Sequence, residues 1–116
     1  MDIGISFEGI GLWAATFACG ETTVGQVVKI SGNGQVAACA DGDSFCGVTE
    51  FVARDGGACS VALGGMVRVP YTGTAPTLGW ESLAADGNGG VKAASTGRSY
   101  LVVDVDESDK TVTFAL

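Results

Sequence analysis

The sequence of 116 residues contains no histidine. Without histidine the chain cannot form a Ser-His or Cys-His catalytic pair or a histidine-ligated metal site. The commonest general base near neutral pH is missing as well. Chemistry that depends on histidine is therefore excluded.

Positive charge is also scarce. Six Lys and Arg residues stand against thirteen Asp and Glu residues, which gives a net charge of -7. The basic residues are spread singly along the chain, so they cannot form the basic stripe that neutralises phosphates. We expect no nucleic-acid partner and no membrane partner, because nucleic acid and anionic lipid repel an acidic chain.

Long hydrophobic runs are missing too. No apolar run approaches the roughly 18 residues of a membrane span. The N-terminus carries Asp2 where a signal peptide carries positive charge. We expect a protein that is made in a cytoplasm.

The four cysteines lack the CxxC spacing of zinc and redox sites. A domain of this size can build a core without disulfides. We therefore expect the cysteines to be reduced and to act as small apolar side chains, with no metal and no cofactor. They are Cys19, Cys39, Cys46 and Cys59.

Glycine is abundant, with 19 residues, and only 16% of the chain is charged. Apolar residues alternate with polar or small ones in short runs, and glycine-rich turns such as 86–90 separate the runs. This pattern predicts one all-β domain over 1–116, with roughly ten short strands in a small barrel or sandwich. Alternating runs include Ile3, Ile5 and Phe7; Cys59, Val61 and Leu63; and Leu101, Val103 and Val105.

The chain also contains an internal repeat. Residues 23–26 match 77–80, the Gly-Asn-Gly turn at 32–34 matches 87–89, and 42–48 match 97–103, with about ten identities in roughly 25 aligned positions. Each copy predicts a three-stranded hairpin unit with one apolar face, and two such units can cover each other. The alignment places Cys39 opposite Ala94 and Cys46 opposite Leu101, which favours core positions for both cysteines.

The repeat divides the domain into regions. Residues 21–69 form the first repeat region and 77–116 the second. Both prolines lie in 70–76, which predicts a crossing loop because proline cannot serve a central strand. Residues 1–20 form an N-terminal arm or the first strands.

Candidate chemical sites are weak. Residues 104–109 have some calcium-loop character but lack the turn glycine and the closing glutamate, so we expect a strand that enters a polar turn. The glycine clusters lack a following helix, which predicts hairpin turns rather than a phosphate site. Paired carboxylates beside turns are ordinary solvated charges. We expect no catalytic, cofactor-binding or metal-binding residues.

Several aromatic residues can either pack in the core or line an interface. Trp80 aligns with Gln26, so its position tolerates a polar residue and can face outward. A chain with few charges also exposes apolar area that a partner can bury. Tyr71 and Trp80 are our candidate protein-interface residues. The aromatic residues open to both roles are Trp13, Phe17, Tyr71, Trp80 and Tyr100.

Five segments together carry a resemblance. In this order they resemble the capsid cement, or head decoration, proteins of tailed bacteriophages and prophages, over roughly residues 20 to 116. They are VGQVVK at 24–29, GNG at 32–34, GDSFCGV at 42–48, GGMVRVPYTG at 64–73 and LAADG at 83–87.

The resemblance implies a non-enzymatic protein on the capsid exterior of a virion, made in the bacterial host cytoplasm. Such a protein binds the assembled head, often as a homotrimer, and clamps neighbouring copies of the phage major capsid protein. It also implies a compact β-barrel or β-clip-like core, which suits the duplicated hairpin unit. The family has no motif that assigns functional residues to this chain.

Two other functions stay open at this point. One is a small β-barrel binding module for a carbohydrate or an appendage protein on a virion or cell surface. The other is an accessory enzyme domain of the β-clip type. A concave pocket lined by aromatic residues would favour ligand binding over a structural role.

Overall fold

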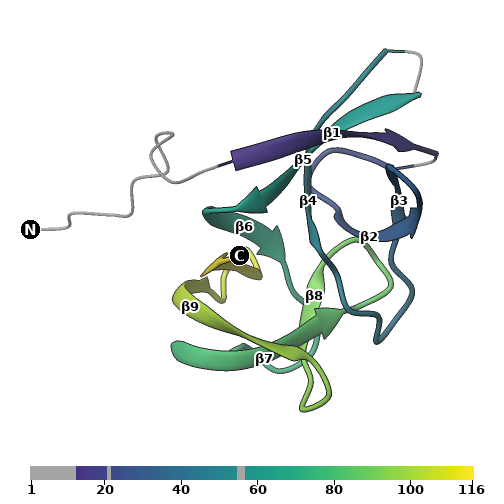
Figure 1. Ribbon diagram of the computed structural model, residues 1–116. Coiled ribbons are helices and arrows are strands. Elements are labelled where there is room, and N and C mark those ends of the chain that lie inside the picture. The colour runs from purple at the N-terminus through teal and green to yellow at the C-terminus, as the bar shows by residue number, and fades with distance from the viewer. Residues whose placement is uncertain (1–12, 21, 55–56) are drawn as a thin grey trace, which may run out of the picture.

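The computed structural model describes residues 13–20, 22–54 and 57–116, and within them the fold is all-β, with ten strands (Figure 1). The predicted fold class is therefore confirmed. The alternating run Ile3, Ile5 and Phe7 lies outside the described residues, whereas 13–19 form the first strand.

The first five strands close into a barrel with the order β1-β3-β2-β4-β5. A short parallel pairing of β1 with β3, at Ala18–Gln35 and Cys19–Val36, completes the closure, and the other pairs are antiparallel. The strands are β1 (Trp13–Cys19), β2 (Val27–Gly32), β3 (Gln35–Ala38), β4 (Gly47–Val52) and β5 (Ala58–Gly64).

The last five strands form a second sheet with the order β6-β10-β9-β7-β8. Tyr71, directly after β6, makes a parallel bridge to Val91 of β8, so this sheet also curves back towards its own start. The strands are β6 (Met66–Pro70), β7 (Gly79–Ala85), β8 (Val91–Ala93), β9 (Arg98–Asp106) and β10 (Thr111–Ala115).

The two sheets repeat the same topology, so the duplication includes more than the predicted three strands. The predicted unit β2-β3-β4 corresponds to β7-β8-β9 with the same neighbours, and β1 and β5 correspond to β6 and β10. The structure divides the chain at Gly65, between β5 and β6, rather than in the proline-containing segment. Pro70 ends β6, and the crossing to β7 follows it.

The strand pairing corrects the sequence alignment of the repeats. Val28 of β2 and Leu83 of β7 are equivalent, because each pairs with the last residue of the following strand. On its other side each pairs with the first residue of the next strand but one, Gly47 of β4 and Arg98 of β9, so Gly47 and Arg98 are equivalent as well. Cys46 therefore precedes β4 and is not equivalent to Leu101 of β9. The reason is that the connection 39–46 is longer than its counterpart 94–97, a difference that glycine matching does not detect.

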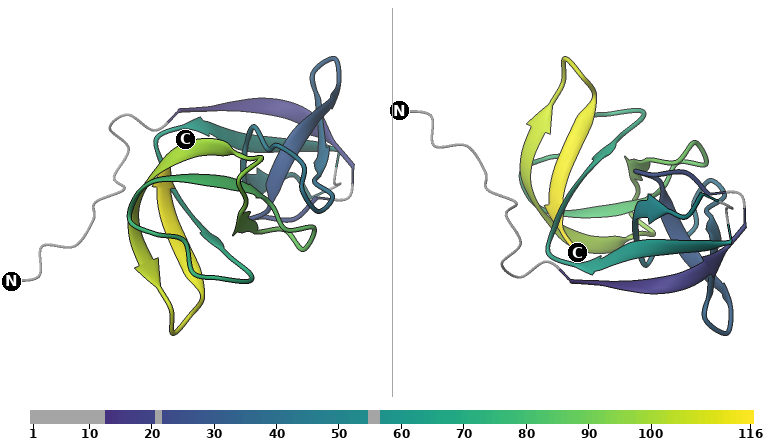
Figure 2. Two further views of the ribbon diagram at one scale, coloured as in Figure 1. Left: turned by 90° about the horizontal axis from the view of Figure 1, so that it is seen from below. Right: turned by 90° about the horizontal axis from the view of Figure 1, so that it is seen from above.

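One large core joins both halves of the chain. Phe45, on the connection between β3 and β4, stacks on Tyr100 with a centroid distance of 5.1 Å and contacts Phe114 at 5.9 Å. The same core includes Val27 and Val48 from the first barrel and most buried residues of the second sheet. The two halves therefore form one packed body (Figure 2). A smaller core inside the first barrel contains Cys19, Val28, Val36, Cys59 and Val61.

Candidate protein-interaction site

The two candidate interface residues have opposite environments. Trp80 on β7 is 73% exposed, whereas Tyr71 is only 3% exposed. Tyr71 is buried because its bridge to Val91 carries it into the large core, where Lys110 covers its ring at 5.9 Å. The prediction of Tyr71 as a contact residue is corrected on this ground, and Trp80 remains.

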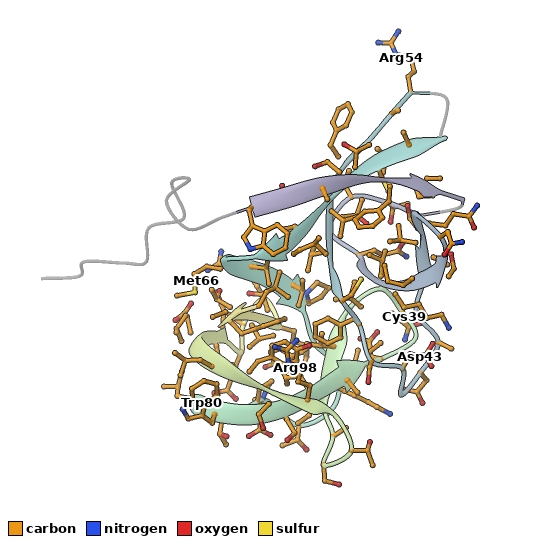
Figure 3. The ribbon with its side chains drawn as sticks, viewed as in Figure 1. Cys39, Asp43, Arg54, Met66, Trp80 and Arg98 are labelled. Atoms are coloured by element: carbon orange, nitrogen blue, oxygen red, sulfur yellow. The ribbon has the colours of Figure 1, made fainter. Side chains whose placement is uncertain are left out.

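Trp80 heads a row of apolar side chains that crosses the second sheet. The strand register places Trp80 beside Leu101, Leu101 beside Ala115, and Ala115 beside Met66. All four lie on the outer face, because their sequence neighbours such as Val102 and Phe114 are buried. We call these four residues the Trp80 face. Figure 3 shows Trp80 and Met66 on the same side of the molecule.

Shallow grooves flank Trp80 on both sides. One, of about 400 Å³, lies between Trp80–Ser82 and Ala93–Ser95. The other, of about 210 Å³, lies between Trp80 and the C-terminal Leu116, with Arg98 at its rim. An exposed indole between two grooves offers a partner an apolar anchor, and the grooves can accept side chains of the partner beside it.

The charges near the Trp80 face are few. Arg98 lies over the ring of Tyr100, 5.3 Å from its centroid, and Arg68 pairs with Asp104 at 3.6 Å. Burial raises the pKa of the Tyr100 phenol, so Tyr100 stays neutral at physiological pH. The face is therefore an apolar surface with one cation, Arg98, beside Trp80.

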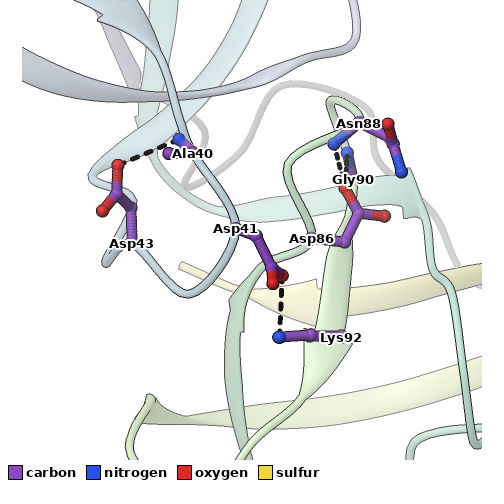
Figure 4. A network of polar contacts seen from close by, with 7 residues as sticks. All are labelled: Ala40, Asp41, Asp43, Asp86, Asn88, Gly90 and Lys92. Atoms are coloured by element: carbon purple, nitrogen blue, oxygen red, sulfur yellow. Dashed lines mark hydrogen bonds and ion pairs between the residues drawn. The ribbon is translucent and has the colours of Figure 1, made fainter.

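The acidic residues of the long connection 39–46 serve the fold. Asp43 accepts hydrogen bonds from the Lys29 ammonium at 2.6 Å and from the Ala40 amide at 2.9 Å. The Lys29 contact lowers the pKa of Asp43, and Asp43 in turn raises the pKa of Lys29. Asp41 pairs with Lys92 of β8 at 2.7 Å (Figure 4). The Asp41–Lys92 pair attaches the connection to the second sheet, whereas the Lys29–Asp43 pair attaches it to β2 of the first barrel.

Asp86 closes the turn between β7 and β8. Its carboxylate accepts hydrogen bonds from the amides of Asn88 at 2.7 Å and Gly90 at 3.1 Å (Figure 4). Asp106 does the same in the β9–β10 turn, with the amides of Ser108 and Asp109, both at 3.0 Å. Both are side-chain-stabilised turns, so residues 104–109 form the strand and polar turn that the sequence predicts.

The cysteines lie in apolar surroundings. All four are free, three are buried, and Cys46 is partly buried. Burial raises the pKa of Cys39 and of Cys59 to about 11 and also raises that of Cys46. Because the thiolate is the nucleophile and the metal ligand, these three side chains are poorly suited to either role near neutral pH.

Leu78, directly before β7, is also exposed, and further exposed apolar side chains lie on the first barrel. The indole of Trp13, at the start of β1, lies against Gly64 at the end of β5. Phe51 on β4 is 63% exposed beside Thr16 and Ala58.

Phe51 is exposed and Met66 and Leu101 are partly exposed, and none of the three was predicted from the sequence to lie on the surface. Phe51 was not predicted because a β-bulge beside it shifts the alternation of inward and outward side chains along β4. Met66 and Leu101 were not predicted because the pairing register between β6, β10, β9 and β7 brings them into one row, and a single strand does not reveal that register.

The chain matches none of the protein-family models and none of the curated proteins with which it was compared. Over 13–20, 22–54 and 57–116, no three His, Cys, Asp or Glu side chains gather closely enough to hold a metal ion. The described residues include no helix that is long and apolar enough to cross a membrane.

Proposed function

We propose that this protein is a non-enzymatic structural protein that binds and stabilises an assembled phage capsid. In this role the Trp80 face contacts the phage major capsid protein, and copies of the chain associate, with a homotrimer as the expected form. The exposed Trp80 between two grooves is the observation that supports the proposal most directly. The resemblance of segments 24–87 to decoration proteins supports the choice of partner.

The physical argument rests on exposed apolar area and on mass action. A tryptophan with 73% of its surface in water is typical of an interface anchor, since burying it on a partner removes apolar area from water. Binding only to the assembled lattice stabilises that lattice relative to free subunits. Repetition over many lattice sites adds avidity.

Co-sedimentation with undecorated heads of the phage that encodes the chain tests the proposal. We expect the wild-type protein to pellet with intact heads and to raise the temperature at which they release DNA. Trp80→Ser should weaken binding by tenfold or more, the order expected for loss of an interface anchor. Its fold stability should change by no more than about 0.5 kcal/mol, because the side chain is exposed.

Phe51→Ser is the matched control, since Phe51 is an exposed aromatic residue on β4 of the first barrel, away from the Trp80 face. It should bind heads like the wild type. Absence of co-sedimentation with wild-type protein, or equal loss in both variants, would overturn the assignment of the Trp80 face to a capsid.

A second candidate function is carbohydrate binding. The groove of about 400 Å³ joins the Trp80 indole to Glu81, Ser82 and Ser95, and sugars bind by stacking on an aromatic ring while polar groups fix their hydroxyls. A glycan array with Trp80→Ser as the negative control tests this. Selective glycan retention together with no binding to heads would favour the carbohydrate module.

A further inference from the structure

Two of the four thiols are neighbours across the β1–β5 pairing of the first barrel. Phe17 of β1 lies opposite Cys59 of β5. Two residues further along β1, the Cys19 amide donates a hydrogen bond to the Gly57 carbonyl at 3.4 Å. Cys19 and Cys59 are therefore diagonal neighbours, and both side chains are buried in the same small core. Burial raises the pKa of Cys59 to about 11, and the Cys19 thiol beside it contributes to this rise.

The second half of the chain contains the same pair of positions. Tyr71 is the counterpart of Cys19, because each residue pairs in parallel with the third strand of its half. The Tyr71 amide donates to the Lys110 carbonyl at 3.0 Å, two residues before Val112, so Val112 is the counterpart of Cys59. Tyr71 and Val112 share the large core. The duplicated fold therefore brings these two positions into one core in each half, and in the first half both positions hold a thiol.

Cys19 lies where the first barrel closes. In the described chain, the parallel seam of β1 with β3 consists of two residue pairs, Ala18–Gln35 and Cys19–Val36. The chain just after it is open, since nothing lies within 4 Å of a Cβ placed on Gly20. A short seam and a long hydrogen bond thus hold the end of β1. A covalent bond from Cys19 to β5 would fix that end.

Both thiols belong to residues that line surface grooves. Cys19 lines a groove of about 390 Å³ over the β1–β3 seam, together with Ser31 and Gln35. Cys59 lines a groove of about 150 Å³ beside Phe51. Cys19 is the more exposed of the two cysteines, at 8% against 2%. A small reagent therefore reaches Cys19 first, when the end of β1 moves.

We propose that Cys19 and Cys59 are a redox pair, which closes to an internal disulfide by exchange with a small-molecule disulfide and so fixes the end of β1. Diagonal neighbours lie about 7–8 Å apart, slightly beyond the usual Cα separation of about 4.4–6.8 Å in a disulfide. Closure therefore draws the end of β1 towards β5, and the long hydrogen bond of 3.4 Å at that end leaves room for this shift. The redox pair goes beyond the proposed function because it needs no capsid.

The exchange takes two steps. The Cys19 thiolate attacks one sulfur of the reagent, which forms a mixed disulfide and releases the first reagent thiolate. The Cys59 thiolate then attacks the Cys19 sulfur, which forms the internal bond and releases the second reagent thiolate. The two cysteine protons pass through solvent to the two released thiolates. Two electrons thus leave the cysteine pair and reduce one reagent disulfide to two thiols.

Mass spectrometry of the full chain tests the proposal. Cys39→Ala with Cys46→Ala keeps the proposed pair and removes the other two thiols. In mildly alkaline buffer with bis(2-hydroxyethyl) disulfide, we expect this folded variant to lose two hydrogens and to retain no mercaptoethanol. Digestion should yield a disulfide-linked peptide pair that contains Cys19 and Cys59. Retained mercaptoethanol, unmodified thiols, or an internal bond that forms only in urea would overturn the proposal.

Cys19→Ala with Cys59→Ala is the matched control. It keeps Cys39, which lies in the large core, and Cys46, which packs against the small one. Under the same conditions it should form no internal bond, because its two thiols belong to different cores. An internal bond that forms equally fast in this control would show that the exchange does not select the Cys19–Cys59 pair, and the proposal would be wrong.

The bond should also change the fold at the end of β1. The oxidised Cys39→Ala, Cys46→Ala variant should melt about 10 °C above its reduced form, because the bond closes the loop between residues 19 and 59. The amides of Ala18 and Cys19 should exchange hydrogen at least about tenfold more slowly. Dithiothreitol should reverse both effects. An internal disulfide that alters neither would refute the fixing of β1, and none of these results depends on binding to heads.

Discussion

At the scale of single residues, close backbone approach decides where only glycine fits. The chain passes from β8 to β9 across β7, and a Cβ placed on Gly97 would lie 2.2 Å from the Leu83 carbonyl oxygen. That oxygen belongs to a paired strand and cannot move aside without breaking its ladder. Gly97 is therefore required by packing rather than by turn geometry, since it is not among the glycines with positive φ.

Gly97→Ala should destabilise the fold by about 1–3 kcal/mol, the usual cost of overpacking a rigid site. Urea unfolding followed by circular dichroism measures this change. Gly20→Ala is the control, because nothing lies within 4 Å of a Cβ there. The control should stay within about 0.5 kcal/mol of the wild type. Equal stability of the two variants would contradict the close crossing.

Cys39 shows how burial affects a titratable side chain. It is 9% exposed, in the large core, and its pKa is raised to about 11 chiefly by burial. A raised pKa in the folded state gives stability that is present below the ordinary thiol pKa of about 8.5 and is lost as pH rises through the folded value. The thiol therefore makes the fold weaker in alkaline solution.

Replacing Cys39 with Ala removes this titration. The free energy of unfolding of the wild type should fall between about pH 9 and pH 11, and Cys39→Ala should fall less over that range. At pH 7 the variant should lose no more than about 1.5 kcal/mol, as expected for a small volume change in a core. Chemical denaturation at a series of pH values measures both effects. Parallel pH profiles for the two proteins would contradict the buried-thiol account.

At the scale of elements, the connection 39–46 holds the two halves together. Its backbone pairs with β7, since the Gly42 amide donates to Ala85 at 2.8 Å and the Ala85 amide donates to Asp43 at 2.9 Å. Its side chains add the Asp41–Lys92 ion pair to β8, while the Lys29–Asp43 pair fixes the connection to β2 of its own half. The extra length relative to 94–97 gives the loop room to place Phe45 in the core of the second sheet.

Asp43→Asn should make the stability of the fold depend less on pH, both in acidic and in alkaline solution. The pKa of Asp43 is lowered in the fold, so its contribution is present above its ordinary value and is lost as pH falls through the folded value. The pKa of Lys29 is raised, so its contribution is lost as pH rises through the folded value. Thermal unfolding across pH measures this. Asp109→Asn makes the same charge change in the β9–β10 turn and should keep the wild-type profile, and a matching loss in that control would contradict a specific ion pair.

At the scale of the whole molecule, the shared core makes the two halves unfold together. Phe45 comes from the first half, and Tyr100 and Phe114 from the second, and each aromatic pair adds about 0.5–1.5 kcal/mol beyond its buried area. Separating the halves would expose this cluster and break the Asp41–Lys92 ion pair and the backbone hydrogen bonds between 42–43 and Ala85. The fold therefore behaves as one cooperative unit despite its duplicated topology.

Two single-tryptophan variants test this cooperativity. Trp13→Phe leaves a probe on the second sheet, and Trp80→Phe leaves one on β1 of the first barrel. In each variant we expect the urea midpoint from tryptophan fluorescence to coincide with the midpoint from circular dichroism of the same variant. Separate midpoints within one variant would indicate halves that unfold independently.

Much of this fold was predictable from the sequence because the signals are local. Alternation along single strands and glycine-rich turns predict an all-β chain, and matched turns at 32–34 and 87–89 predict a duplication. The lack of histidine excludes histidine-dependent chemistry in any fold. Each of these patterns is made by residues close in sequence or by composition, so each can be recognised without the tertiary structure.

The tertiary structure decided what depends on pairing between distant strands. Tyr71 and Trp80 looked alike in sequence, yet a bridge to Val91 buries the first, and the early end of β8 leaves the second at an open edge. The Trp80 face likewise arises from register across four strands. Register is fixed by which apolar sets share a core, and that depends on contacts between residues far apart in the chain.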